Sequence, residues 1–88
     1  MNNRKIIGHF QQKYYDQFGV QPKINGAICG KMIKNLSEDT DEETVIRIID
    51  LFFEDPQNAK KSFHLPTILG AWSINTYLPK AKDNPDLY

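Results

Sequence analysis

The stretch Thr40-Asp-Glu-Glu-Thr-Val-Ile-Arg-Ile-Ile-Asp-Leu-Phe-Phe53 carries the strongest fold signal in the chain. Its apolar side chains recur at helical spacing and cover more than half of a helix circumference. This pattern predicts a largely buried helix over about residues 41–53. Thr40 and Glu43 have the spacing of a capping box, which predicts that Thr40 caps the helix. We expect this helix to be the central one of a bundle.

Two further helices are predicted on the N-terminal side of this stretch. Apolar residues recur every four positions from Ile6 to Phe18, and Gly19 follows where a helix C-cap would lie. They predict a first helix over about residues 3–18. A connector over residues 20–26, with turn-forming proline and glycine, then leads to a second helix over about residues 27–36.

The C-terminal side predicts a polar linker over about residues 54–62 and one more helix. Pro66 fits the first position of that helix, where the missing N–H costs nothing, and Pro79 is expected to end it. We therefore expect one domain over residues 1–79, a compact all-α bundle of four to five short helices, and a flexible tail over residues 80–88. The residues expected to share its core are Phe10, Tyr14, Ile28, Ile49, Phe52 and Trp72. The residues expected to face the core from the last helix are Ile68, Leu69, Trp72 and Tyr77.

Composition and charge limit the class of protein. The 88 residues suit one soluble domain, and no apolar stretch approaches the length of a membrane span. The N-terminal residues do not resemble a secretion signal, and the single Cys29 excludes an internal disulfide, so we expect a cytoplasmic protein. The net charge is zero, but it is +5 over residues 1–37, −7 over residues 38–56 and +2 over residues 57–88.

The residues that usually carry catalysis or bind metal are scattered. His9, Cys29 and His64 are isolated in sequence, and the acidic residues lack the alternating ligands and central glycine of a calcium loop. No serine or cysteine has a positioned base, and Gly30-Lys31 lacks the spacing of a phosphate-binding loop. We therefore expect a binding protein without catalytic residues, cofactor or metal.

Two sets of charged residues are candidates for binding. The first set, which could contact a DNA backbone, is Lys23, Lys31, Lys34, Lys60 and Lys61. Lys31 and Lys34 are three residues apart and should share one helix face. The second set would serve the alternative function, a protein-only adapter or inhibitor that docks on a basic surface of a replication or other host protein, and it is Glu38, Asp39, Asp41 and Glu42. The alternatives are ordinary solubilising lysines and a solvated helix start.

Aromatic side chains could also stack on bases, but at helical spacing they more often belong to the core. Trp72 and Asn75 would join a DNA-binding surface only if the last helix were partly exposed. A lone tryptophan is usually well buried, so we expect Trp72 in the core.

The order of these features resembles a small helical domain of bacteriophage replication proteins. The segments that carry the resemblance are Tyr14-Tyr-Asp-Gln-Phe-Gly19, Pro22-Lys-Ile-Asn25, Ile49-Asp-Leu-Phe-Phe-Glu-Asp-Pro56, Lys60-Lys-Ser62 and Ser73-Ile-Asn75. Similar domains occur at the C-terminal end of replisome-organiser or initiator-like chains, and also alone. The chain departs from the pattern at Phe63-His-Leu-Pro66, where a glycine-aromatic turn is more usual. The resemblance implies a role in phage or mobile-element DNA replication, with DNA or a replication protein such as a helicase or loader as partner.

Overall fold

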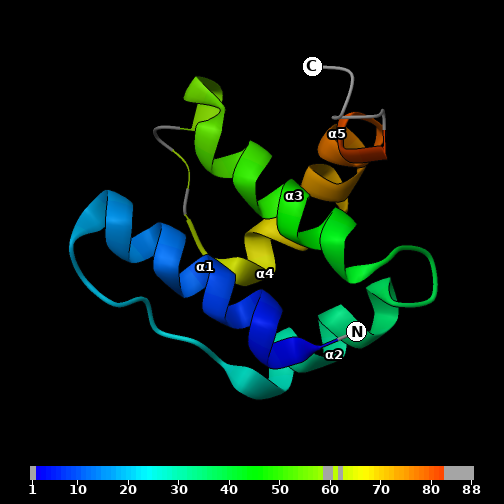
Figure 1. Ribbon diagram of the computed structural model, residues 1–88, viewed down its shortest axis with the longest axis horizontal. Helices are drawn as coiled ribbons and strands as arrows, with labels where there is room; N and C mark the ends of the chain where they lie inside the picture. The colour runs from blue at the N-terminus through cyan, green and yellow to red at the C-terminus, as the bar shows by residue number, and fades with distance from the viewer. Residues whose placement is uncertain (1, 59–60, 62, 83–88) are drawn as a thin grey trace.

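The computed structural model describes residues 2–58, 61 and 63–82, and all the regular structure in these residues is helical. The elements are α1 (Asn3–Phe18), α2 (Gly26–Leu36), α3 (Glu42–Glu54), the 3-10 helix η1 (Pro56–Asn58), α4 (Leu65–Ile68) and α5 (Ala71–Lys82) (Figure 1). The all-α bundle predicted from the sequence is confirmed. The bounds of α1, α2 and α3 agree with the predicted helices to within one residue.

α3 is the central helix, as its broad apolar surface predicts. It contacts α1, α4, α5 and η1, whereas α2 lies at the edge of the molecule against α1 and α4 (Figure 1). The side chains that α3 buries are Val45, Ile48, Ile49 and Phe52. Because four other elements pack on α3, its burial supplies the hydrophobic free energy that holds the bundle together.

The cap of α3 differs from the predicted capping box. Asp41, not Thr40, is the N-cap, and its Oδ1 accepts a hydrogen bond from the Thr44 backbone N–H at 2.8 Å. The prediction of Thr40 as the cap is wrong because the helix starts one residue later, at Glu42. Aspartate is also a stronger N-cap than threonine, since a full carboxylate charge faces the positive end of the helix.

Gly19 ends α1 as predicted. It has φ 74°, in the left-handed region, and its N–H donates to the Tyr15 carbonyl oxygen at 2.8 Å. This conformation is easily adopted by glycine and strained for residues that carry a Cβ.

The predicted last helix is broken in two at Leu69-Gly70. Gly70 donates its N–H to the Thr67 carbonyl oxygen, and a Cβ at Gly70 would lie only 3.3 Å from backbone oxygens of α4. The break gives α5 its own phase, with Ser73, Tyr77 and Ala81 buried at four-residue intervals. Trp72 is one position off this face, and 51% of its surface is exposed.

The predicted core is therefore correct in part. Phe10, Ile49 and Phe52 are buried, and Tyr14 is partly buried against them. The expectation that Ile28 and Trp72 are core residues is wrong, because both are about half exposed. Of the residues expected to face the core after Pro66, Ile68, Leu69 and Tyr77 do so.

Pro79 does not end the last helix, contrary to prediction, because α5 continues through it to Lys82. The missing N–H of Pro79 leaves the Asn75 carbonyl without its helical partner, but Asn75 and Pro79 are both on the exposed side, where water can replace the donor. Ala81 beyond the proline is buried, so residues 80–82 belong to the folded domain and not to a tail. Residues 83–88 of the predicted tail lie outside the described residues.

Candidate functional site

α2 has one buried side and one exposed side. Its N-cap is Asn25, whose Oδ1 accepts from the Ile28 N–H at 3.1 Å, and the helix buries Cys29 and Ile33 against the core. The residues on the opposite side, which we call the α2 outer face, are Ile28, Lys31, Lys34 and Asn35. Ile28, Lys31 and Lys34 follow one another at three-residue intervals, Asn35 lies four positions after Lys31, and all are exposed, so they form one continuous strip.

The presence of Ile28 in this strip was missed by sequence reasoning. Ile28 and Cys29 are adjacent apolar residues, about 100° apart around the helix axis, so the direction in which the helix faces decides which of them is buried. The structure buries Cys29, and Ile28 remains 49% exposed. The α2 outer face thus combines two ammonium groups, one amide and one apolar side chain, with no acidic residue in the helix itself.

The predicted lysine set does not form a single patch. The connector that carries Lys23 leads directly into α2, and Lys23, Lys31 and Lys34 are all exposed. Lys61 lies elsewhere, because its backbone N–H donates to the carbonyl oxygen of Asn58 in η1, at the C-terminal end of α3. Lys60 lies outside the described residues.

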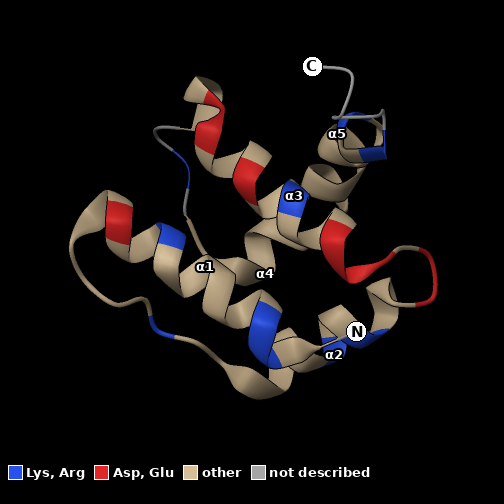
Figure 2. Cartoon of the chain, viewed as in Figure 1, with Lys and Arg blue, Asp and Glu red and all other residues tan. Residues whose placement is uncertain are grey.

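The acidic candidates lie in the loop that joins α2 to α3 and at the first residue of α3 (Figure 2). The Asp41 carboxylate already accepts a hydrogen bond as the N-cap of α3. Glu42 accepts a hydrogen bond from the Asn2 backbone N–H at 2.8 Å and contacts the Lys5 Nζ at 3.2 Å. Glu38 and Asp39 are exposed. Half of the set therefore holds α3 and the N-terminal end of α1 in place.

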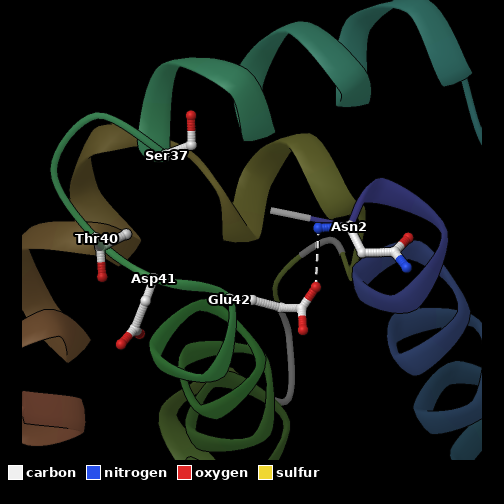
Figure 3. Close-up of a pocket in the computed structure, with 5 residues that line it drawn as sticks. All are labelled: Asn2, Ser37, Thr40, Asp41 and Glu42. Atoms are coloured by element: carbon white, nitrogen blue, oxygen red, sulfur yellow. Dashed lines mark hydrogen bonds between the residues drawn. The ribbon is translucent and has the colours of Figure 1, made fainter.

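A shallow pocket of about 370 Å³ adjoins these acids, lined by Asn2, Ser37, Thr40, Asp41 and Glu42. Figure 3 shows the Glu42 carboxylate turned toward Asn2, whereas the Asp41 carboxylate points away from it. The side chains do not converge on a common point and none of the lining residues is apolar, so the pocket lacks both the geometry and the apolar lining of a small-molecule site.

A buried hydrogen-bond chain links the end of α3, η1 and α5. The Tyr77 hydroxyl donates to Asp55 Oδ2 at 2.7 Å and accepts from Asn58 Nδ2 at 2.7 Å, and the same amide donates to the Phe52 carbonyl oxygen at 2.9 Å. Burial, and then the hydrogen bond to Asp55, raise the pKa of the Tyr77 hydroxyl. The chain satisfies the Asn58 amide nitrogen and the Tyr77 hydroxyl, whereas the buried Asn58 Oδ1 has no hydrogen-bond partner among the described residues. The chain is structural in character.

The remaining reactive groups give no catalytic arrangement. Cys29 is buried, and burial raises the pKa of its thiol, which keeps it in the unreactive protonated form. His9 Nε2 lies 2.6 Å from Asp50 Oδ1, to which Lys13 also approaches. Among the described residues there is no group of three His, Cys, Asp or Glu side chains that could hold a metal ion. In the same part of the chain no helix combines the length and apolar character needed to cross a membrane.

The carboxylates that hold the elements together predict how stability depends on pH. Hydrogen bonds from the Asn2 amide and then Lys5 lower the pKa of Glu42, and hydrogen bonds from Tyr77 and then Gln57 lower that of Asp55. A lowered folded-state pKa means that the stabilisation is present above the ordinary carboxyl pKa and is lost as the pH falls through the folded value. We expect the urea midpoint to decrease below about pH 4.

The variant Glu42→Gln tests this dependence, because it keeps an acceptor oxygen but removes the titrating charge. Its urea midpoint should be lower than that of the wild type at neutral pH, and the difference should shrink under acidic conditions. Glu43→Gln, at the exposed neighbouring position, is the matched control. A constant difference between Glu42→Gln and the wild type across this pH range would contradict the assignment.

Comparison of the chain with protein-family models, curated proteins and solved structures finds no match.

Proposed function

We propose that the protein is a non-catalytic, cytoplasmic DNA-binding accessory protein of phage or mobile-element DNA replication, which contacts the phosphate backbone through the α2 outer face. The observation that carries the proposal is the pair Lys31 and Lys34, exposed side by side on a helix without acidic residues. The replication context rests on the resemblance of the sequence to phage replication domains.

The arrangement of α2 supports this proposal. The helix lies at the edge of the bundle and packs against α1 and α4 on one side, which leaves the opposite side free for a duplex (Figure 1). Lysine is a point charge that suits phosphate, and the connector that leads into α2 carries one more exposed lysine, Lys23. Asn35 is the one amide on the outer face that can read a base edge, so we expect mainly backbone contacts with weak sequence preference.

The competing proposal is a protein adapter that docks through the acidic segment. The contacts of this segment argue against it, because Asp41 caps α3 and Glu42 is paired with Lys5 and hydrogen-bonded to Asn2. These carboxylates are not free to exchange their partners without a cost in stability. Glu38 and Asp39 alone offer a weaker docking surface.

The experiment is a double charge reversal, Lys31→Glu with Lys34→Glu, in protein shown by circular dichroism to remain folded. Binding to a short labelled duplex is measured by fluorescence anisotropy at several salt concentrations. Each lost phosphate contact removes about 0.9 from the slope of log affinity against log salt, so the slope should fall by about 2. Affinity should fall most at low salt.

A matched comparison separates the site from net charge. Lys31→Gln with Lys34→Gln and, on α1, Gln12→Glu with Gln17→Glu each lower the net charge by two. The first pair should weaken binding more than the second. Equal effects, or an unchanged salt slope in the charge reversal, would show that these lysines only solubilise the protein. Absence of DNA binding at about 50 mM salt, where phosphate contacts are strong, would instead favour the adapter.

A further inference from the structure

We infer that Trp72 and Lys61 form a second nucleic-acid site, at which an unpaired base of a single strand stacks on the indole while lysine contacts its phosphate. The site is separate from the α2 outer face, and it rests on the proposed function for the class of its ligand. The juxtaposition that carries it is a half-exposed tryptophan with an ammonium group 3.5 Å from the ring centroid.

The exposure of Trp72 follows from the fold. The break at Gly70 sets the phase of α5 so that Ser73 and Tyr77 face inward, and Trp72 is left outside. The indole is nevertheless held in position, because its ring meets the Tyr77 ring edge-on, with centroids 6.1 Å apart and planes at 89°. Tryptophan side chains are usually well buried, so an indole ring that is held in one orientation but remains half exposed is uncommon in a small domain.

Lys61 covers the face of the Trp72 ring through a weak interaction. A cation–π contact at an exposed site is weak, so a base can displace the ammonium group from the ring face. The Lys61 backbone is anchored by its hydrogen bond to the Asn58 carbonyl oxygen at 2.9 Å, which keeps the displaced side chain close by. The ammonium group would then be available to the phosphate of the stacked nucleotide.

Lysine ammonium groups lie on and near the aromatic pair. Lys61 Nζ lies over the Trp72 ring, and Lys80 Nζ lies 6.0 Å from the centroid of the Tyr77 ring, on which Trp72 packs. Asp55 accepts the Tyr77 hydroxyl proton in a hydrogen bond at 2.7 Å, and the exposed Glu54 lines the same pocket as Tyr77 and Lys80. The group on the ring face itself is the Lys61 ammonium, and an exposed aromatic ring next to a lysine matches the alternation of base and phosphate in a single strand.

A single strand is favoured over a duplex by the geometry of stacking. The bases of a duplex present their faces to one another, and a side chain on a helix surface cannot reach them without unstacking. A single strand exposes the faces of its bases and can lay them on an aromatic ring without that cost. The same chemistry would accept DNA or RNA, so both are included in the test.

The test uses the fluorescence of Trp72, which is the one tryptophan of the chain. The full-length protein is titrated with short oligo(dT) and oligo(U) at about 50 mM salt, where phosphate contacts are strong. Stacking should quench the emission with the same midpoint as binding measured by anisotropy of the labelled strand. The affinities of the two strands show whether DNA or RNA is preferred.

Variants connect the signal to the site. Base–aromatic stacking is worth about 1–3 kcal/mol, so Trp72→Ala should weaken single-strand binding by about 5- to 150-fold, whereas Trp72→Phe should retain most of it. Tyr15→Ala removes a similarly exposed aromatic on α1 and should leave the affinity unchanged. Because Trp72 is at the surface, Trp72→Ala should remain folded, which circular dichroism checks.

The outcomes separate this inference from the proposed function. If the Lys31→Glu, Lys34→Glu variant loses DNA binding while Trp72→Ala binds single strands like the wild type, the Trp72 site is wrong and the α2 assignment stands. The reverse result supports the Trp72 site and overturns the α2 outer face. Emission that changes with protein concentration alone would show that a second copy covers Trp72, and no binding of any strand would overturn both proposals.

Discussion

Replacing Phe52 with Ala should lower the free energy of unfolding by about 3–5 kcal/mol, the range observed when a buried phenylalanine is truncated. The ring is fully buried at the point where α3 meets α5 and the chain leading into α4. It packs edge-on against the Phe63 ring at 5.5 Å and the Tyr77 ring at 6.1 Å. Such a loss is a large part of the roughly 5–15 kcal/mol that stabilises a typical domain.

Urea denaturation followed by circular dichroism measures this effect. Phe52→Leu fills part of the same space and should lose less stability than Phe52→Ala. Tyr15→Ala truncates an aromatic side chain that is half exposed on α1, and should change the stability by about 0.5 kcal/mol or less. If Phe52→Ala unfolds at the same urea concentration as the wild type, α3 is not the centre of the core.

The second large effect is expected from Asn58→Asp, which changes one group of a fully buried side chain. The amide group of Asn58 donates to the Phe52 carbonyl oxygen and to the Tyr77 hydroxyl. An ionised carboxylate donates neither hydrogen bond and places a negative charge close to Asp55. We expect a loss of about 3–5 kcal/mol at neutral pH, the cost of an uncompensated buried charge.

The pH dependence of the stability of Asn58→Asp shows whether the buried charge causes the loss of stability. Burial raises the folded-state pKa of the new carboxyl group above its unfolded value, so the penalty is absent below the unfolded pKa and grows as the pH rises through it. The stability difference between Asn58→Asp and the wild type should therefore shrink toward about pH 4. Asn75→Asp introduces the same charge on the exposed side of α5 as a control. A penalty that is equal at both pH values would mean that lost packing, not charge, destabilises the variant.

Local signals in the sequence were sufficient to predict the first three helices. The four-residue spacing between Ile6 and Phe18, the glycine at position 19 and the apolar arc of α3 each act within a few residues of the chain. Helical periodicity and capping are short-range effects, so they can be recognised in the sequence without knowledge of the tertiary contacts. The exposure of Lys31 and Lys34 was predicted on the same basis and agrees with the structure.

The orientation of single side chains was less predictable where two apolar residues are adjacent or where a helix breaks. Ile28 and Cys29 are adjacent, and the packing of α2 against α1 and α4 buries Cys29 and leaves Ile28 half exposed. The break at Gly70 resets the helical phase and moves Trp72 to the surface. A helical pattern gives the positions of residues around the helix axis relative to one another. Which side of the helix faces the core depends on the elements that pack against it.

The sequence by itself therefore determined the first three helices, that the helices form a bundle around α3, and that α2 carries an exposed pair of lysines. The tertiary structure alone decided the polar contacts between distant residues. Glu42 meets Asn2 across 40 positions of the chain, and Tyr77 meets Asp55 across 22. It also separated Lys61 from the lysines of α2 and placed it over Trp72. The physical reason is that these contacts form when packed helices bring remote segments together, and no periodicity within a single segment records them.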